Sequence, residues 1–163
     1  MLNWKWPLTA FVAVVLLGFG ARQAIGQVYR SGQALDLLES LSRSGLYLGS
    51  ATATAAATTL ALMLTLVGMV RQSQVDFDAE IYRGIQRIAT LATCSLVASL
   101  LLLLVLVFPI GEFDGISDAW YPTLYQVLFA ATILVVALLA ATVAMVYRTV
   151  RHVIARVTPG DEA

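Results

Sequence analysis

The side chains that could take part in chemistry are few in this sequence, and the polar cluster best suited to binding a ligand is acidic. Glu112, Asp114 and Asp118 place three carboxylates within seven residues, enough to contact a hard cation such as Ca²⁺. Their spacing lacks the regular series of ligands found in a calcium-binding loop. An acidic loop is therefore the simpler interpretation, and we expect no metal site here.

Several other kinds of site are excluded because the residues that they need occur only once or not at all. Cys94 is the one cysteine of the chain, which excludes an intramolecular disulfide, a paired-cysteine redox site and a thiolate metal cage. His152 is the one histidine, which excludes a haem held by two histidines. The sequence also contains no glycine-rich phosphate loop, nucleophile elbow or zinc-binding helix. We therefore expect no catalytic residue and no cofactor, and we expect that the protein is not an enzyme.

Long stretches without charge dominate the chain, and they must form the structure that positions any functional residue. Hydrophobic residues make up 60% of the 163 residues and charged residues 12%, against about a quarter charged in a typical soluble domain. A helix needs about 20 apolar residues to cross the hydrocarbon core of a bilayer. The sequence therefore predicts an all-α integral membrane four-helix bundle, a single domain over residues 1–163, with spans near residues 6–26, 47–70, 88–110 and 122–147.

The predicted spans lack the ionisable residues on which ion-coupled transport and voltage sensing depend. Proton-coupled transport and voltage sensing place Asp, Glu, His, Lys or Arg inside the membrane. The last three spans contain none of these residues, and Arg22 lies near the outer end of the first span, within reach of the interface. The small multidrug transporters, which also have four helices, need a glutamate within the membrane that this chain lacks.

The basic residues are distributed unevenly between the two sides of the predicted bundle, and short cytoplasmic segments are enriched in them. One side, made of the N-terminal segment, the second loop and the tail, carries Lys5, Arg71, Arg83, Arg87, Arg148, Arg151 and Arg156. The other side carries Arg22, Arg30 and Arg43 in the first loop. We therefore expect both termini in the cytoplasm, in a plasma membrane (the inner membrane of a bacterium). The aromatic residues expected at the outer interface are Trp120, Tyr121 and Tyr125.

The first span allows two interpretations. An apolar stretch after Lys5, followed by small residues at Ala24 and Gly26, has the pattern of a secretory signal with a cleavage site. Trp4 and Trp6 on either side of Lys5 favour a retained signal-anchor helix, which is the interpretation adopted in the four-span prediction. Cleavage would leave three spans and the same outward third loop.

Helical segments are also expected outside the membrane. Ser31 and Gly45 suit the two caps of a short amphipathic helix on the outer surface, although a plain packed connector is the simpler alternative. Within it, Glu39 and Arg43 stand four residues apart in the favourable order for an ion pair. On the other side, the third helix is predicted to start near Ser73 and to run for ~35 residues, or ~50 Å, so that it projects into the cytoplasm. The tail extends the fourth helix in the same way.

Arginines on these cytoplasmic extensions are candidates for contact with lipid headgroups. Arg83 and Arg87 stand four residues apart on one helical face, and the tail carries Arg148, Arg151 and Arg156. Each arginine near an anionic membrane surface contributes about 1 kcal/mol. Anchoring by the positive-inside bias alone explains these residues, and binding of a specific lipid or partner is the alternative.

One pattern within the spans is distinctive: small and hydroxyl residues recur in register. In the second span, at spacings of 4, 3, 4 and 3, the pattern comprises Thr54, Thr58, Ala61, Thr65 and Gly68. The third span adds Ser95 and Ser99. Helices in lipid associate by close backbone approach and by hydroxyl hydrogen bonds, both of which small residues permit. Helix packing is thus the simpler interpretation, and a weakly polar pathway lined by the hydroxyl groups is the alternative.

Two hypotheses on function follow from this architecture. The first is a structural or accessory membrane protein, surrounded by the bilayer, that assembles through its small-residue faces with a second copy or with another membrane protein. The second is a small channel or uniporter for a neutral solute. The formal net charge of zero gives no indication of nucleic-acid binding, and we expect none.

Overall fold

In the computed structural model of the chain, the described residues are 5–25, 31–72, 79–107 and 120–157, and all of them are helical. They form α1 (Lys5–Ile25), α2 (Ser31–Gln72), α3 (Ala79–Val107) and α4 (Trp120–Val157). Each of these four described helices is long and apolar enough to cross a membrane. The predicted all-helical class with four membrane spans is therefore confirmed at this level.

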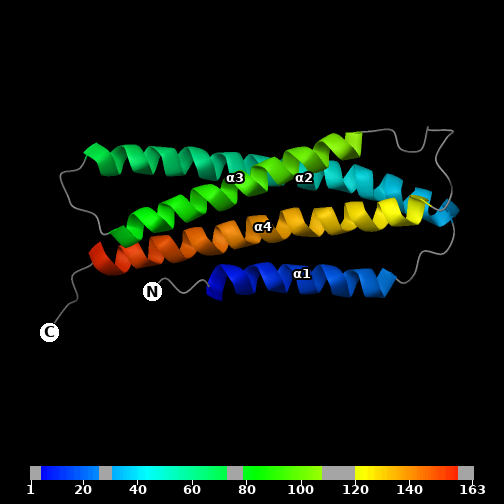
Figure 1. Ribbon diagram of the computed structural model, residues 1–163, viewed down its shortest axis with the longest axis horizontal. Helices are drawn as coiled ribbons and strands as arrows, with labels where there is room; N and C mark the ends of the chain where they lie inside the picture. The colour runs from blue at the N-terminus through cyan, green and yellow to red at the C-terminus, as the bar shows by residue number, and fades with distance from the viewer. Residues whose placement is uncertain (1–4, 26–30, 73–78, 108–119, 158–163) are drawn as a thin grey trace.

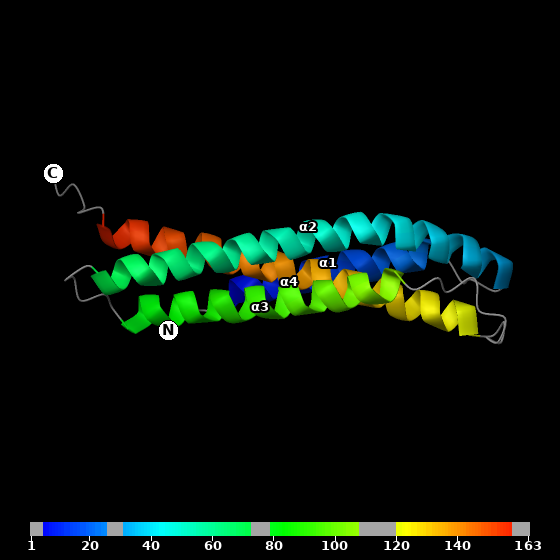
Figure 2. The same ribbon diagram turned by 90° about the horizontal axis from the view of Figure 1, so that it is seen from above.

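The described helices lie side by side along the long axis of the molecule, with α4 in the middle (Figures 1 and 2). The pair α2 and α3 packs on one side of α4, and α1 packs on the other. Successive helices run in opposite directions, so the start of α1, the start of α3 and the end of α4 lie together at one end of the bundle. We call this the basic end, because Lys5, Arg83, Arg87, Arg148 and Arg151 are located there.

The contact between α2 and α3 depends on two glycines. A Cβ atom on Gly49 would lie 2.9 Å from Cδ2 of Leu103, and one on Gly45 would lie 2.8 Å from Cδ1 of Leu106. Leucine side chains of α3 therefore rest directly on the backbone of α2. One turn further along α2, Thr52 continues the same buried stripe. Close backbone approach of this kind is how helices associate in lipid.

The helix before the second span differs from the prediction. The sequence predicted a separate short helix ending at Gly45, whereas α2 runs without a break from Ser31 to Gln72. Gly45 provides close packing in the middle of a helix instead of a C-cap. Ser42 strengthens the same contact, because its hydroxyl donates a hydrogen bond to the carbonyl oxygen of Leu106 at 3.0 Å. The 42 residues of α2 extend for ~63 Å, about twice the thickness of the hydrocarbon core.

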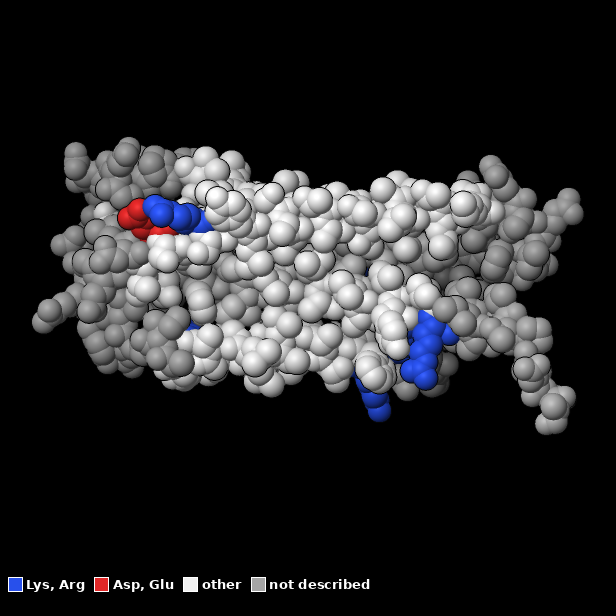
Figure 3. Space-filling view, turned by 180° about the vertical axis from the view of Figure 1, so that it is seen from behind, with Lys and Arg blue, Asp and Glu red and all other residues white. Residues whose placement is uncertain are grey.

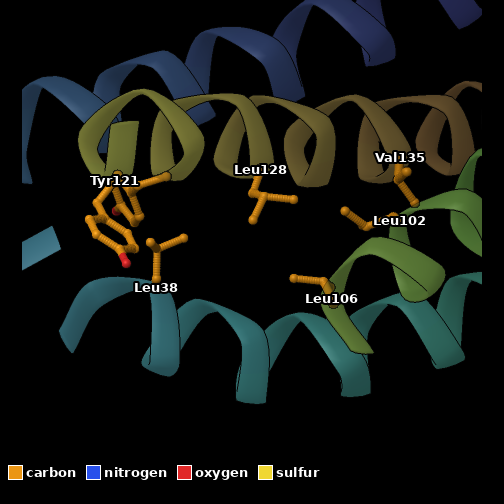
Figure 4. Close-up of a cluster of buried hydrophobic side chains, with 7 residues drawn as sticks. Leu38, Leu102, Leu106, Tyr121, Leu128 and Val135 are labelled. Atoms are coloured by element: carbon orange, nitrogen blue, oxygen red, sulfur yellow. The ribbon is translucent and has the colours of Figure 1, made fainter. Parts of the chain in front are cut away.

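A cluster of buried hydrophobic side chains joins α2, α3 and α4 toward the end of the bundle opposite the basic end (Figure 4). Its members are Leu38, Leu102, Leu106, Tyr121, Tyr125, Leu128 and Val135. Tyr121 and Tyr125, which the sequence placed at the outer membrane interface, are each only 7% exposed, whereas Trp120 is 66% exposed. The two tyrosines therefore contribute to packing between helices, and Tyr125 stacks on Phe129 with ring centroids 5.9 Å apart.

The start of α3 and the end of α4 pack together at the basic end. A Cβ atom on Gly84 would lie 3.3 Å from Thr149, and Ile85, Ile88 and Met145 are buried nearby in the same part of the bundle. In the described structure α3 begins at Ala79 and has 29 residues, or ~44 Å. The capping residues predicted from Ser73 onward lie outside the described residues.

Two glycines of α1 provide a test of how this helix is held. A Cβ atom on Gly18 would lie 2.5, 2.6 and 2.8 Å from three side-chain carbons of Ile133, while one on Gly20 would meet nothing within 4 Å. We expect Gly18→Ala to lower the free energy of unfolding by about 1–3 kcal/mol, because the β-branched isoleucine cannot move aside cheaply. Gly20→Ala should leave it unchanged or raise it by up to ~1 kcal/mol. Reversible unfolding in mixed micelles would measure both, and equal values would contradict the observed packing of α1 on α4.

Candidate functional site

The small-residue stripe predicted in the second span faces away from the rest of the molecule. Its five residues, Thr54, Thr58, Ala61, Thr65 and Gly68, are all exposed. Apart from its own helix backbone, no atom of the described residues lies within 4 Å of the position that a Cβ on Gly68 would occupy. We call these five residues the outer face of α2. In a bilayer this face would contact lipid or another protein.

The threonines of the outer face direct their hydroxyl hydrogens back to their own helix. Thr54 donates to the carbonyl oxygen of Ser50 at 2.9 Å, Thr58 to that of Thr54 at 2.8 Å, and Thr65 to that of Ala61 at 3.0 Å. Each hydroxyl therefore has a partner for its one hydrogen and keeps a free lone pair. The outer face can lie against apolar groups without leaving a donor unsatisfied.

A second small-residue stripe, which was not predicted from the sequence, occupies the opposite side of α2. It consists of Gly45, Gly49, Thr52 and Ala56, at spacings of 4, 3 and 4, and all four are buried. Thr52 and Thr54 are two residues apart, which separates them by about 200° around the helix. We call this stripe the inner face of α2. The sequence shows its heptad spacing. Because both faces of α2 have that spacing, the spacing alone does not predict which face packs inside the bundle.

Hydroxyl groups join α2 to α3 at the inner face. The hydroxyl oxygens of Thr52 and Ser99 lie 2.9 Å apart, and both residues are almost fully buried, at 2% and 0% exposure. Each hydroxyl has a single hydrogen, so one of the two donates across the contact while the other donates within its own helix, either Thr52 to the carbonyl oxygen of Gly49 or Ser99 to that of Ser95. The hydroxyl of Ser95 itself is buried and has no hydrogen-bond partner in the described part of the chain. A hydrogen bond between helices in this setting contributes about 0.6 kcal/mol and at most ~2 kcal/mol.

The hydroxyl groups proposed for a solute pathway do not share one surface. Ser95 and Ser99 lie inside the bundle, whereas Thr54, Thr58 and Thr65 lie outside it. A pathway lined by all five would need hydroxyls from both sides of α2. Within one copy of the described chain, the two sets are separated by the helix itself.

Charged side chains gather toward the ends of the molecule, and a long uncharged band lies between them on the face shown in Figure 3. At the end opposite the basic end, the predicted pair forms: Arg43 lies 3.2 Å from Glu39. Because both side chains are exposed, this pair adds only about 0.3–0.5 kcal/mol. Arg22 donates a hydrogen bond to Gln126 at 3.0 Å, which links α1 to α4.

The predicted lipid-contact arginines lie mainly at the basic end. Arg83 and Arg87 both have interaction partners. Arg151 is exposed, Arg148 is partly buried, and the side chain of Arg156 is outside the described part of α4. Among these residues, Arg148 has an unusual environment, because its Nη1 atom is buried and has no hydrogen-bond partner in the described part of the chain.

The candidate chemical groups do not form a reactive centre in the described helices. The acidic residues Glu112, Asp114 and Asp118 lie outside the described residues, and the described residues contain no cluster of three potential metal ligands. Cys94 is exposed on α3.

Fold and surface together define a class: a multi-pass helical membrane protein with an uncharged central band. Comparison of the chain with protein-family models, with curated proteins and with solved structures finds no match. The function must therefore be inferred from the surfaces of the molecule itself.

Two serines one turn apart on α3 test the bond between helices. We expect Ser99→Ala to lower the free energy of unfolding by about 0.6–2 kcal/mol, because it removes the hydrogen bond to Thr52. We expect Ser95→Ala to leave it unchanged or to raise it, because the hydroxyl that is lost has no partner. Unfolding of the two variants under identical conditions measures the difference. A larger loss for Ser95→Ala than for Ser99→Ala would refute the assignment.

Proposed function

We propose that the protein is a non-enzymatic structural or accessory subunit of a membrane assembly, joined to its neighbour through the outer face of α2. The partner is a second copy of the chain or another membrane protein. The observation that carries this proposal is the outward orientation of the complete stripe from Thr54 to Gly68. Apart from its own helix backbone, nothing among the described residues lies within 4 Å of the position that a Cβ atom on Gly68 would occupy.

The inner face of α2 supports the proposal by showing what such a stripe does when it has a partner. There, Gly45 and Gly49 let leucines of α3 rest on the backbone, and Thr52 bonds to a hydroxyl of the neighbouring helix. The outer face has the same spacing and the same types of residue. Since lipid tails are as apolar as leucine, helices in a bilayer gain by associating where small residues let their backbones come close. The outer face meets that condition along four turns.

Thr54, Thr58 and Thr65 have each used their hydrogen within α2, and each oxygen can still accept a bond. Another membrane protein with hydroxyl donors could therefore bond to the outer face. A second copy arranged about a two-fold axis would bring the same small residues, because such interfaces pair a surface with itself, and since its threonines have also used their hydrogens that contact would rest on close approach of the backbones.

We further propose that both termini lie in the cytoplasm and that the membrane is a plasma membrane, the inner membrane in a bacterium. Seven basic residues support this orientation from the basic end, where α1 and α3 begin and α2 and α4 end: Lys5, Arg71, Arg83, Arg87, Arg148, Arg151 and Arg156. The opposite end has Arg22 and Arg43 among the described residues, and Arg43 is neutralised by Glu39. Positive charge accumulates on the cytoplasmic side of membrane proteins.

Bulky replacements on the outer face should break the assembly. We expect Thr58→Leu and Gly68→Leu to weaken association by about five-fold to over a hundred-fold, because overpacking a close contact costs about 1–3 kcal/mol. Native mass spectrometry in mild detergent, supported by size-exclusion chromatography, would measure the loss.

Matched controls are available on the other helices. Thr90 is an exposed threonine on α3 that also donates to its own helix, and Gly20 is a glycine on α1 with nothing within 4 Å. Thr90→Leu and Gly20→Leu should leave the assembly intact. If the outer-face variants keep the wild-type size, or if all four variants lose it equally, the outer face is not the contact surface.

The orientation can be tested by labelling single cysteines in a Cys94→Ala background. We expect Ser117→Cys, in the third loop, to react with a membrane-impermeant maleimide in intact cells. Ser73→Cys, in the second loop, should react only after the membrane has been permeabilised. The reverse pattern would place the termini outside and overturn the proposed orientation.

A further inference from the structure

A groove of about 1100 Å³ runs between α1 and α4 toward the basic end of the bundle. Its α1 wall includes Ala10 and Ala13, and its α4 wall includes Ala140 and Ala144. Alanines on both sides leave the space that larger side chains would fill. The volume slightly exceeds the roughly 300–1,000 Å³ typical of pockets for small molecules.

The groove spans the depth of one membrane leaflet. Its α4 wall extends from Val136 to Arg151, fifteen residues apart, which corresponds to ~22 Å along a helix. Half of a bilayer that includes its headgroup regions is ~20–23 Å thick. The groove therefore runs from about the middle of the membrane to its surface. Trp6 and Tyr147 line the surface end, at the level where such aromatic residues meet lipid headgroups.

The surface end of the groove is positively charged. Arg148 and Arg151 line it, and none of the described lining residues is acidic. The Nη1 atom of Arg148 is buried and has no hydrogen-bond partner in the described part of the chain. Buried polar groups in proteins almost always have a partner, and a guanidinium is well suited to bind phosphate oxygens. The hydroxyl of Thr9 already donates its one hydrogen to the carbonyl oxygen of Trp6 at 2.8 Å, so it has no hydrogen left to donate to an anion in the groove.

We propose that this groove is a binding site for one anionic phospholipid, whose phosphate contacts Arg148 and Arg151 and whose acyl chain lies between α1 and α4. The cationic end of the groove suits the phosphate of such a lipid, and the apolar walls suit its acyl chain. The length of the groove matches the depth of one leaflet. The inference is independent of the proposed assembly through α2, because the groove lies on other helices. It also goes beyond general anchoring, since it assigns one lipid to one position.

A lipid suits this groove better than a helix from another protein. The charge lies at one end only, and the apolar part is confined to one leaflet, whereas a membrane-spanning helix would need a surface that continues through both leaflets. Near the other leaflet, α1 and α4 close on each other at Gly18 and Ile133. The groove therefore ends where a lipid tail would end.

The test is a lipid titration of the full-length protein by native mass spectrometry in detergent. The probes are phosphatidylglycerol and phosphatidylcholine with identical acyl chains. We expect phosphatidylglycerol to bind first and with the higher affinity, with one molecule per chain bound before the others. Equal affinity for the two lipids, or the absence of a first tightly bound molecule, would overturn the proposal.

Variants locate the bound lipid. Arg148→Gln and Arg151→Gln should each weaken binding of phosphatidylglycerol roughly five-fold, since each arginine near an anionic headgroup is worth about 1 kcal/mol. Arg43→Gln, at the opposite end, removes the same charge and should have no effect. Ala144→Leu should weaken binding by filling the groove without changing the charge, whereas Ala130→Leu, on an exposed part of α4, should not.

The contact with the lipid headgroup and the contact with the acyl chain are thus tested separately. Wild-type affinity in the two arginine variants would overturn the phosphate site, and wild-type affinity in Ala144→Leu would overturn the acyl-chain site. Far-ultraviolet circular dichroism and the apparent Tm of each variant establish that it is folded. Addition of inorganic phosphate at millimolar concentration should not displace the lipid, and displacement would show that the groove walls contribute nothing to binding.

Discussion

Lipid tails are as apolar as leucine side chains, so a helix in a bilayer gains little by exchanging one for the other. Stable packing then requires that backbones approach closely enough for dispersion and hydrogen bonds to act. The α2–α3 contact satisfies this requirement through Gly45 and Gly49, where any Cβ atom would collide with a leucine of α3. The Thr52–Ser99 hydrogen bond adds a directional interaction in the same place. Helix α4 packs on this α2–α3 pair, and α1 packs on α4, so the positions of both helices depend on the α2–α3 contact.

The same constraint explains why the molecule is asymmetric. Helix α4 packs against α2 and α3 on one side and against α1 on the other, so it is the element that the others share. Helix α1 packs tightly against α4 at Gly18 and is joined to it again by the Arg22–Gln126 hydrogen bond. Between that closure and the basic end, alanines replace larger residues and the two helices enclose a groove. The outer face of α2 is left on the far side of the bundle.

Much of this architecture could be predicted from the sequence, because charge is almost absent from four long stretches and a bilayer admits few solutions for such a chain. The continuity of α2 was missed, since Gly45 suits a C-cap as well as a close contact and local sequence does not distinguish them. The inner and outer faces of α2 share one spacing, so only the position of α3 shows which face is buried. The groove depends on which helix lies beside α1, and nothing in the local pattern specifies that neighbour.

The length of α2 has a mechanical consequence. A bilayer including its headgroups is about 40–45 Å thick, and an unbroken helix of ~63 Å is longer than that. Helix α2 therefore acts as a rod that links the two surfaces of the membrane without a hinge among its described residues. A tilt imposed at one end must reappear at the other as a lateral displacement that grows with the length of the overhang. A neighbour attached to the middle of this rod would transmit its own motion to both sides of the membrane at once.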